Sequence, residues 1–294
     1  MKVLLTGLSG FLGKSLRRQL PGRHEYVSIS RKKQDWDRDM QILPGDLNRM
    51  DDLRDELCRL RPDICVHLAW EGIPDYSFTI SYRNLSAGIE LFRFLVNECG
   101  CRKIVSAGSC WEYGKSFGVC REDDPVDSGS YFVWAKRALC DFGMSLAREE
   151  KIDFVWLRLF YLYGPGQHGE SLIPSIRRSL AKGICPELKT PLNAHDFIYV
   201  DDAASAFIKS AFNNIPTGVY NVGAGISIPV WRLCEITERL SDKGTAHYEE
   251  LRKTALPQTA NFWADTGRSR ATLDWEAEKD IEEGIRDLIN QEEQ

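Results

Sequence analysis

The first half of the chain alternates short apolar runs with apolar residues spaced four apart. Val3-Leu4-Leu5 is a run typical of a buried strand, and the stretch from Phe11 to Leu20 has the spacing of a helix that ends at Pro21-Gly22. The same alternation predicts further strands at 26–30, 64–69, 103–106 and 154–159, and further helices at about 50–60, 82–99 and 131–150. This order favours an α/β fold, a doubly wound parallel sheet covered by helices on both faces.

The second half of the chain is less regular. Gly164-Pro165-Gly166 marks a break, and prolines interrupt the segments that follow it. We therefore predict a Rossmann-type dinucleotide-binding domain and a smaller C-terminal substrate-binding lobe. The predicted domain covers residues 1–164 and about 194–222, and the predicted lobe covers 165–193 and 223–294.

A glycine-rich turn separates the first predicted strand from the first predicted helix. Gly7, Gly10 and Gly13 follow the strand at intervals of three residues. Gly7 permits a tight turn, Gly10 lets the backbone approach a pyrophosphate, and Gly13 lets the helix lie close to the sheet, while the helix N-terminus supplies N–H groups for the phosphates. Glycines also make plain turns, but strand, turn and helix appear here in the order that dinucleotide binding requires.

Composition narrows the class of protein. The chain has 294 residues, 43% of them hydrophobic, and a formal net charge of −5 without a strongly basic block, which argues against nucleic-acid binding. The nine cysteines and five histidines show no metal-ligand spacing, so we expect reduced thiols and no metal. No signal peptide and no apolar stretch of about 20 residues is apparent, so we expect a cytoplasmic protein without a membrane partner.

The G-x-x-G-x-x-G spacing resembles the extended short-chain dehydrogenase/reductase family, which includes nucleotide-sugar epimerases, dehydratases and ketoreductases. Tyr220-Asn221-Val222-Gly223 and Leu273-Asp274-Trp275 are also similar to family segments, so the resemblance covers nearly the whole chain. It implies an NAD(P) cofactor, a nucleoside-diphosphate sugar as substrate and a homodimer. The helices expected to pair in the dimer, 82–99 and 131–150, carry apolar stripes, which could equally be core.

The end of the second predicted strand indicates which dinucleotide is bound. An acidic residue there would bind the ribose of NAD, but this chain has Ser30-Arg31-Lys32-Lys33, which suits the 2′-phosphate of NADP. The other interpretation is an ordinary solvated basic turn, and NAD remains possible. With the resemblance, the residues expected at the cofactor are Gly7, Gly10, Phe11, Leu12, Gly13, Ser30, Arg31, Asp46, Leu47, Leu68, Ala69, Asn84, Lys136 and Phe160.

The expected catalytic residues are Ser109, Tyr131 and Lys136. Ser109 lies four residues before a Tyr-Gly pair, where the family has the hydroxyl residue that holds a sugar oxygen. In the family's 4,6-dehydratases an Asp-Glu pair follows this residue. Here Cys110 and Trp111 stand there, which argues against dehydration.

The family motif Tyr-x-x-x-Lys is broken in this chain. Counting back four residues from Lys136 gives Phe132, while Tyr131 lies five residues before Lys136, about 100° away on a helix. Three interpretations follow. Tyr131 serves after a local distortion of the helix start, another group or water ordered by Ser109 moves the proton, or the protein binds its ligands without redox catalysis.

The resemblance also indicates a substrate side. It places Trp70, Trp111, Tyr161 and His195 at the sugar nucleotide. Tyr161 replaces a frequent Asn, and His195 replaces an arginine that grips the diphosphate in the family; His195 could also be a plain loop residue. We therefore expect an NADP-dependent reductase, or epimerase, of a keto-sugar carried on a nucleoside diphosphate. The alternative is a dinucleotide-binding sensor or scaffold.

Overall fold

The fold centres on a parallel sheet of seven strands. It was obtained as a computed structural model, which describes residues 1–32, 40–241 and 246–290. The strand order is β11-β7-β5-β4-β1-β2-β3, with every pair parallel. The strands are β1 (Lys2–Thr6), β2 (Glu25–Ser30), β3 (Met40–Pro44), β4 (Ile64–His67), β5 (Lys103–Ser109), β7 (Asp153–Leu159) and β11 (Gly218–Val222). This confirms the predicted fold class.

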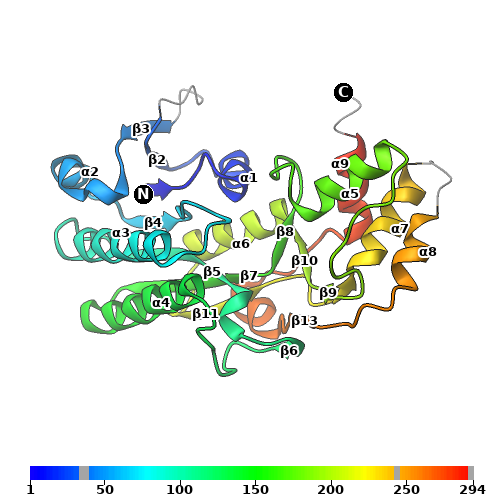
Figure 1. Cartoon of the computed structure of the whole chain (residues 1–294). Coiled ribbons are helices and arrows are strands. Elements are labelled where there is room, and N and C mark those ends of the chain that lie inside the picture. Colours follow the sequence, from blue (N-terminus) through cyan, green and yellow to red (C-terminus); the bar gives the residue numbers. More distant parts are fainter. Residues whose placement is uncertain (33–39, 242–245, 291–294) are drawn as a thin grey trace.

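Helices cover both faces of this sheet, because successive side chains of a strand point to opposite sides. Val3 and Leu5 of β1 join one core cluster with α1 and α6, whereas Leu4 joins a second cluster with α3 and α4. Figure 1 shows α3 and α4 side by side. The helical segments of this part are α1 (Phe11–Gln19), η1 (Leu47–Asp52), α2 (Arg54–Leu60), α3 (Phe78–Asn97), η2 (Cys110–Tyr113), α4 (Tyr131–Glu150) and α6 (Val200–Phe212).

A smaller group of elements gathers at the opposite side of the molecule in Figure 1. Its helices share a third apolar cluster, which includes Ile173, Leu233 and Ile285. The helices are α5 (Leu172–Ala181), α7 (Val230–Leu240), α8 (His247–Arg252) and α9 (Ile281–Asn290), with the short segment η3 (Ser269–Leu273) before α9. Two small sheets accompany them, one of β8 (Tyr161–Tyr163) and β10 (Phe197–Tyr199), the other of β6 (Phe117–Cys120), β9 (Ala194–His195), β12 (Ile228–Pro229) and β13 (Asn261–Ala264).

Most predicted elements are present, with three differences. The strand β3 was not predicted, and neither was β11, whose residues had been noted only for their family likeness. The helix predicted at about 50–60 is two segments, η1 and α2, with Leu53 between them at φ −105°. Within the predicted lobe, the irregular pattern indicated no strand, whereas the structure has β12 and β13 there. The exact domain boundaries stay a prediction.

The apolar stripes of α3 and α4 are core. Leu91, Leu95 and Leu139 are fully buried within the chain, and Phe94 and Leu146 are nearly so. Phe142, which belongs to the α4 stripe, is only partly buried. The homodimer stays a prediction. Among the described residues, no helix has the length and apolar character needed to cross a membrane.

Candidate active site

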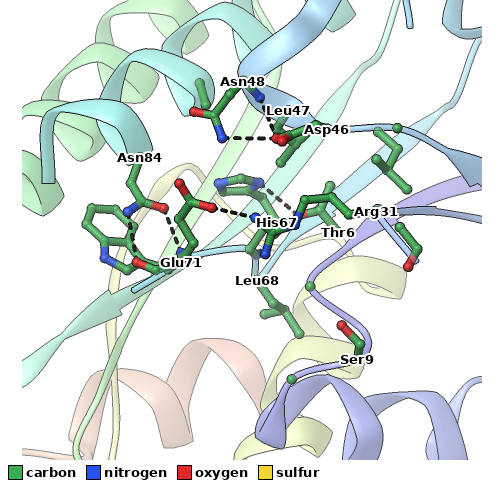
Figure 2. Close-up of a pocket in the computed structure, with 18 of the residues that line it drawn as sticks. Thr6, Ser9, Arg31, Asp46, Leu47, Asn48, His67, Leu68, Glu71 and Asn84 are labelled. Carbon is green, nitrogen blue, oxygen red and sulfur yellow. Dashed lines mark hydrogen bonds and ion pairs between the residues drawn. The ribbon is translucent and has the colours of Figure 1, made fainter. Parts of the chain in front are cut away.

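A cavity of about 450 Å³ lies at the carboxyl edge of the large sheet. Its walls come from the chain segments that leave β1, β2 and β4, with η1 and α3 closing the sides (Figure 2). Crevices at this edge of open parallel sheets are the usual place for dinucleotides. The predicted cofactor residues that line the cavity are Gly7, Gly10, Ser30, Arg31, Asp46, Leu47, Leu68, Ala69 and Asn84, joined by Trp70, which we had expected at the substrate.

The glycine turn has the geometry that a pyrophosphate requires. Gly7 has φ +77°, and a Cβ there would lie 2.6 Å from the backbone nitrogen of Ala69. A Cβ on Gly13 would lie 2.2 Å from the carbonyl oxygen of Gly7, so only glycine lets α1 come this close to the turn. Gly10 is the N-cap of α1 and has no side chain to cap it, so the first turn presents its N–H groups to a ligand. The residues present therefore fit a dinucleotide.

Buried polar contacts hold the loop after β4 against the glycine turn. The hydroxyl oxygen of Thr6 accepts a hydrogen bond from the backbone N–H of Ala69 at 3.2 Å and shares a second one, of 2.9 Å, with Nδ1 of His67. Burial lowers the pKa of His67 to about 3, with Lys136 adding to the effect. His67 is therefore neutral near pH 7, and its role is to fix the wall of the cavity.

Lys136, on α4, reaches the end of β5 and does not itself line this cavity. Its side chain is buried, and Nζ donates a hydrogen bond of 2.7 Å to the carbonyl oxygen of Ala107, two residues before Ser109. The ammonium group also lies 3.9 Å from the ring centre of Trp70. Burial lowers the pKa of Lys136 to about 7, although Glu112 acts in the opposite direction. The structure thus brings Ser109 and Lys136 to the end of the same strand.

A buried ion pair positions Ser109. The Ser109 hydroxyl oxygen accepts from the backbone N–H of Trp111 at 3.2 Å, and the Ser109 N–H donates to the carboxylate of Glu112 at 2.8 Å, a capping box at the start of η2. Glu112 is fully buried, where Arg158 donates to it at 2.9 Å and the indole of Trp156 at 3.0 Å. Our sequence analysis missed Glu112, although the Ser-x-x-Glu spacing signals such a cap.

Phe132, and not Tyr131, lies on the same face of α4 as Lys136. The Phe132 ring centre is 6.0 Å from Nζ of Lys136, and its ring packs against those of Trp70 at 5.4 Å and Tyr76 at 5.2 Å. Tyr131 is 56% exposed, and its ring contacts Phe78 at the surface. The start of α4 is regular, with Ser130 as its N-cap, so the helix shows no distortion that turns Tyr131 toward Lys136.

The substrate-side residues meet around Tyr161. The indole of Trp111 donates to the Tyr161 hydroxyl at 3.2 Å, and the rings of Tyr161 and His195 are 4.4 Å apart. Both line a second cavity of about 250 Å³, which also contains Lys189. Burial lowers the pKa of His195 to about 4, so this histidine is neutral near pH 7 and does not provide the positive charge of the arginine that the resemblance leads us to expect there.

Some predicted cofactor residues lie elsewhere. The side chains of Leu12 and Phe160 are buried in the first core cluster, and Phe11 packs against that cluster. Lys33 lies outside the described residues.

The fold also brings together ligand atoms of Cys185, His247 and Glu250, within 4.8 Å of one another. No spacing in the sequence signals this group, since it joins the segment after α5 to α8.

Comparison with known proteins identifies the family. The family model described as "NAD dependent epimerase/dehydratase family" matches residues 3–223. The chain belongs to this family. Among family relatives, a dTDP-4-dehydro-6-deoxyglucose reductase of Escherichia coli is 26% identical over 98% of this chain and 96% of its own length. A probable dTDP-glucose 4,6-dehydratase of Sinorhizobium fredii is 25% identical over 98% and 92%.

Solved structures agree with this family assignment. The UDP-glucose 4-epimerase of Thermotoga maritima, solved with UDP-glucose, has a TM-score of 0.84 at 18% identity and covers 100% of this chain and 99% of its own. The structure of MoeE5 in complex with UDP-glucose and NAD has a TM-score of 0.82 at 25% identity, with coverage of 100% and 99%. The family relationship supports a general activity on nucleotide sugars with a nicotinamide dinucleotide.

Proposed function

We propose that this chain is an NADP-dependent reductase acting on a keto-sugar carried by a nucleoside diphosphate, with epimerisation through a transient ketone as the other reaction of the same site. One observation carries the proposal. Nζ of Lys136 is bound to the carbonyl oxygen of Ala107, two residues before Ser109, and lies 3.9 Å from the ring centre of Trp70, which lines the cavity with the glycine turn. The likeness to a bacterial protein named as a dTDP-4-dehydro-6-deoxyglucose reductase supports reduction.

The chain's own residues would divide the work as follows. A bound dinucleotide supplies the hydride. In the described contacts, the oxygen of Ser109 accepts a hydrogen bond from Trp111, which leaves the hydroxyl hydrogen to bind the sugar carbonyl oxygen. Lys136 provides positive charge and a donor for the nicotinamide ribose. The ion pair of Glu112 with Arg158 keeps the Ser109 segment in place.

Dehydration fits this site poorly. Cys110 stands where a dehydratase of the family has an acid, and burial raises the pKa of its thiol well above the ordinary value. Trp111 stands where the second carboxylate would be, and its indole is a hydrogen-bond donor that does not act as an acid or a base near neutral pH. Neither residue replaces the acid–base pair that an elimination needs.

The proton that reaches the new hydroxyl group needs a source. Since the exposed Tyr131 faces away from Lys136, we favour water ordered by Ser109 over Tyr131 as the donor. The second candidate function is a dinucleotide-binding sensor or scaffold without turnover. Its support is the buried Phe132, which places an aromatic ring without a proton beside Lys136.

Turnover distinguishes the two functions. Purified protein is mixed with NADPH and a panel of 4-keto nucleotide sugars, and the NADPH absorbance is followed. The reductase predicts loss of absorbance with at least one sugar, and this loss should disappear in Ser109→Ala. Tight binding of NADPH without turnover across the panel supports the sensor. Sedimentation of the same sample tests the homodimer, which the family resemblance supports.

A further inference from the structure

Glu71 extends across the crevice in which the dinucleotide would lie. In the sheet order β4-β1-β2, Glu71 follows β4, Arg31 follows β2, and the glycine turn follows β1 between them. Even so, a carboxylate oxygen of Glu71 lies 2.6 Å from a guanidinium nitrogen of Arg31 (Figure 2). Both residues line the same cavity as the glycine turn.

The carboxylate of Glu71 is held between two cations. Its other oxygen lies 3.0 Å from a guanidinium nitrogen of Arg83 on α3. The backbone of Glu71 is fixed as well, because its N–H donates to the Asn84 side chain at 2.8 Å and its carbonyl accepts from that side chain at 3.1 Å. The Glu71 side chain is 19% exposed, against 59% for Arg31, so the carboxylate is the more enclosed partner.

We propose that Glu71 sets the dinucleotide selectivity of this site, because its carboxylate occupies the position between Arg31 and Arg83 that a 2′-phosphate would take. This inference rests on the proposed NADP-binding site and extends it with two residues, Arg83 as a second cation and Glu71 as an internal competitor. A carboxylate and a phosphate both bind guanidinium groups through charged hydrogen bonds, so they compete for the same donors.

The two dinucleotides place different demands on Glu71. The 2′-phosphate of NADPH must displace the carboxylate from Arg31 or lie beside it, and two negative groups at this distance repel each other. The ribose of NADH has a hydroxyl group there, which donates a hydrogen bond to a carboxylate without displacing it. Glu71 therefore weakens NADPH binding and tolerates or favours NADH.

Binding of both dinucleotides to Glu71→Gln tests the inference. The dissociation constants of NADPH and NADH are measured by the fluorescence of the bound reduced nicotinamide, which requires no sugar substrate. We expect the dissociation constant for NADPH to fall roughly tenfold, because Arg31 then gives its charged hydrogen bond to the 2′-phosphate instead of to Glu71. The dissociation constant for NADH should stay the same or rise. The shorter Glu71→Asp, whose carboxylate withdraws from Arg31, should change the NADPH constant in the same direction by a smaller factor.

Glu90→Gln is the matched control. Glu90 on α3 also bridges two arginines, Arg54 and Arg93, but it lies outside the lining of the dinucleotide cavity. Its substitution should leave both constants unchanged. Equal changes for the two dinucleotides in Glu71→Gln, or weaker NADPH binding, would overturn the inference.

Arg31→Ala separates this inference from the proposed NADP site. If Arg31 binds the 2′-phosphate, Arg31→Ala weakens NADPH far more than NADH, whatever Glu71→Gln does. Equal weakening by Arg31→Ala, together with a selective effect of Glu71→Gln, would refute the Arg31 contact and leave Arg83 as the cation for which Glu71 competes. Arg83→Ala completes the set, and we expect it to weaken NADPH severalfold and NADH little.

Discussion

The two ends of the site differ in how closely they follow the family pattern. At the cofactor end, around Gly7, Gly10 and Arg31, the turn has the glycines, the positive φ and the open helix N-terminus that a pyrophosphate needs. At the proposed catalytic end, around Ser109 and Lys136, the buried Phe132 stands where the sequence resemblance leads us to expect a tyrosine. Cofactor binding and proton transfer therefore depend on different residues. The residues that bind the cofactor can be kept while those that move the proton change.

The largest loss of unfolding free energy that we expect follows the substitution of Glu112, which forms a buried ion pair at the catalytic end. Removing the carboxylate in Glu112→Ala leaves the guanidinium of Arg158 buried without its partner, which should cost about 3–5 kcal/mol of unfolding free energy. The control Glu235→Ala breaks a more exposed pair with Arg232 on α7 and should cost less than about 1 kcal/mol. Urea unfolding measures the free energy of both variants. Similar losses in the two would show that the buried pair of Glu112 and Arg158 stabilises the fold no more than an exposed pair.

The cofactor end is most sensitive at Gly13. A Cβ there meets the backbone of Gly7 and Leu8, so Gly13→Ala must move α1 away from the turn, at about 1–3 kcal/mol. We expect NADPH binding to weaken by at least about tenfold, since the N–H groups of α1 shift with it. Gly22→Ala is the control, because its Cβ would meet nothing within 4 Å. If fluorescence titration finds the same dissociation constant of NADPH in Gly13→Ala as in the unchanged protein, the proposed pyrophosphate site at the glycine turn is refuted.

The sequence predicted those parts of the fold that local patterns determine. The helix at 131–150 and the strand around Val3-Leu4-Leu5 are present because their apolar spacing matches one element type over its full length. By contrast, β3 is only partly buried and lies at the sheet edge, so its residues lack a strong apolar pattern. The strand β11 pairs with β7, which ends 59 residues earlier. A pairing between segments so far apart in the chain cannot be recognised from the residues around either strand.

The candidate site shows the same division. The glycine turn was predictable because its residues are contiguous. The contact of Glu71 with Arg31 and Arg83 was not, since it depends on three segments that meet only in the folded chain. The effect of burial on His195 was equally hidden. The resemblance put His195 in the place of an arginine that binds the diphosphate, whereas the fold encloses the histidine ring among Tyr161, Phe197 and Phe262.

The pH dependence of turnover examines Lys136 at the catalytic end. Because burial lowers its pKa to about 7, the ammonium form predominates below that pH and is lost above it. If the positive charge is needed, kcat/KM should fall about tenfold per unit of pH above 7. Lys136→Arg keeps its charge at every accessible pH, so this decline should be absent there, even if overall activity is lower. The same decline in Lys136→Arg would assign it to another group.

The smallest expected effect concerns Tyr131, and it decides how the catalytic end works. Tyr131 is exposed and in contact with Phe78, so Tyr131→Phe should lower kcat by no more than about threefold. Phe132→Tyr restores a phenol four residues before Lys136, whose charge lowers a phenol pKa, and should raise kcat by about tenfold. A loss of about 100-fold in Tyr131→Phe would instead make Tyr131 the proton donor. In that case the catalytic end would keep the family chemistry through a neighbouring residue.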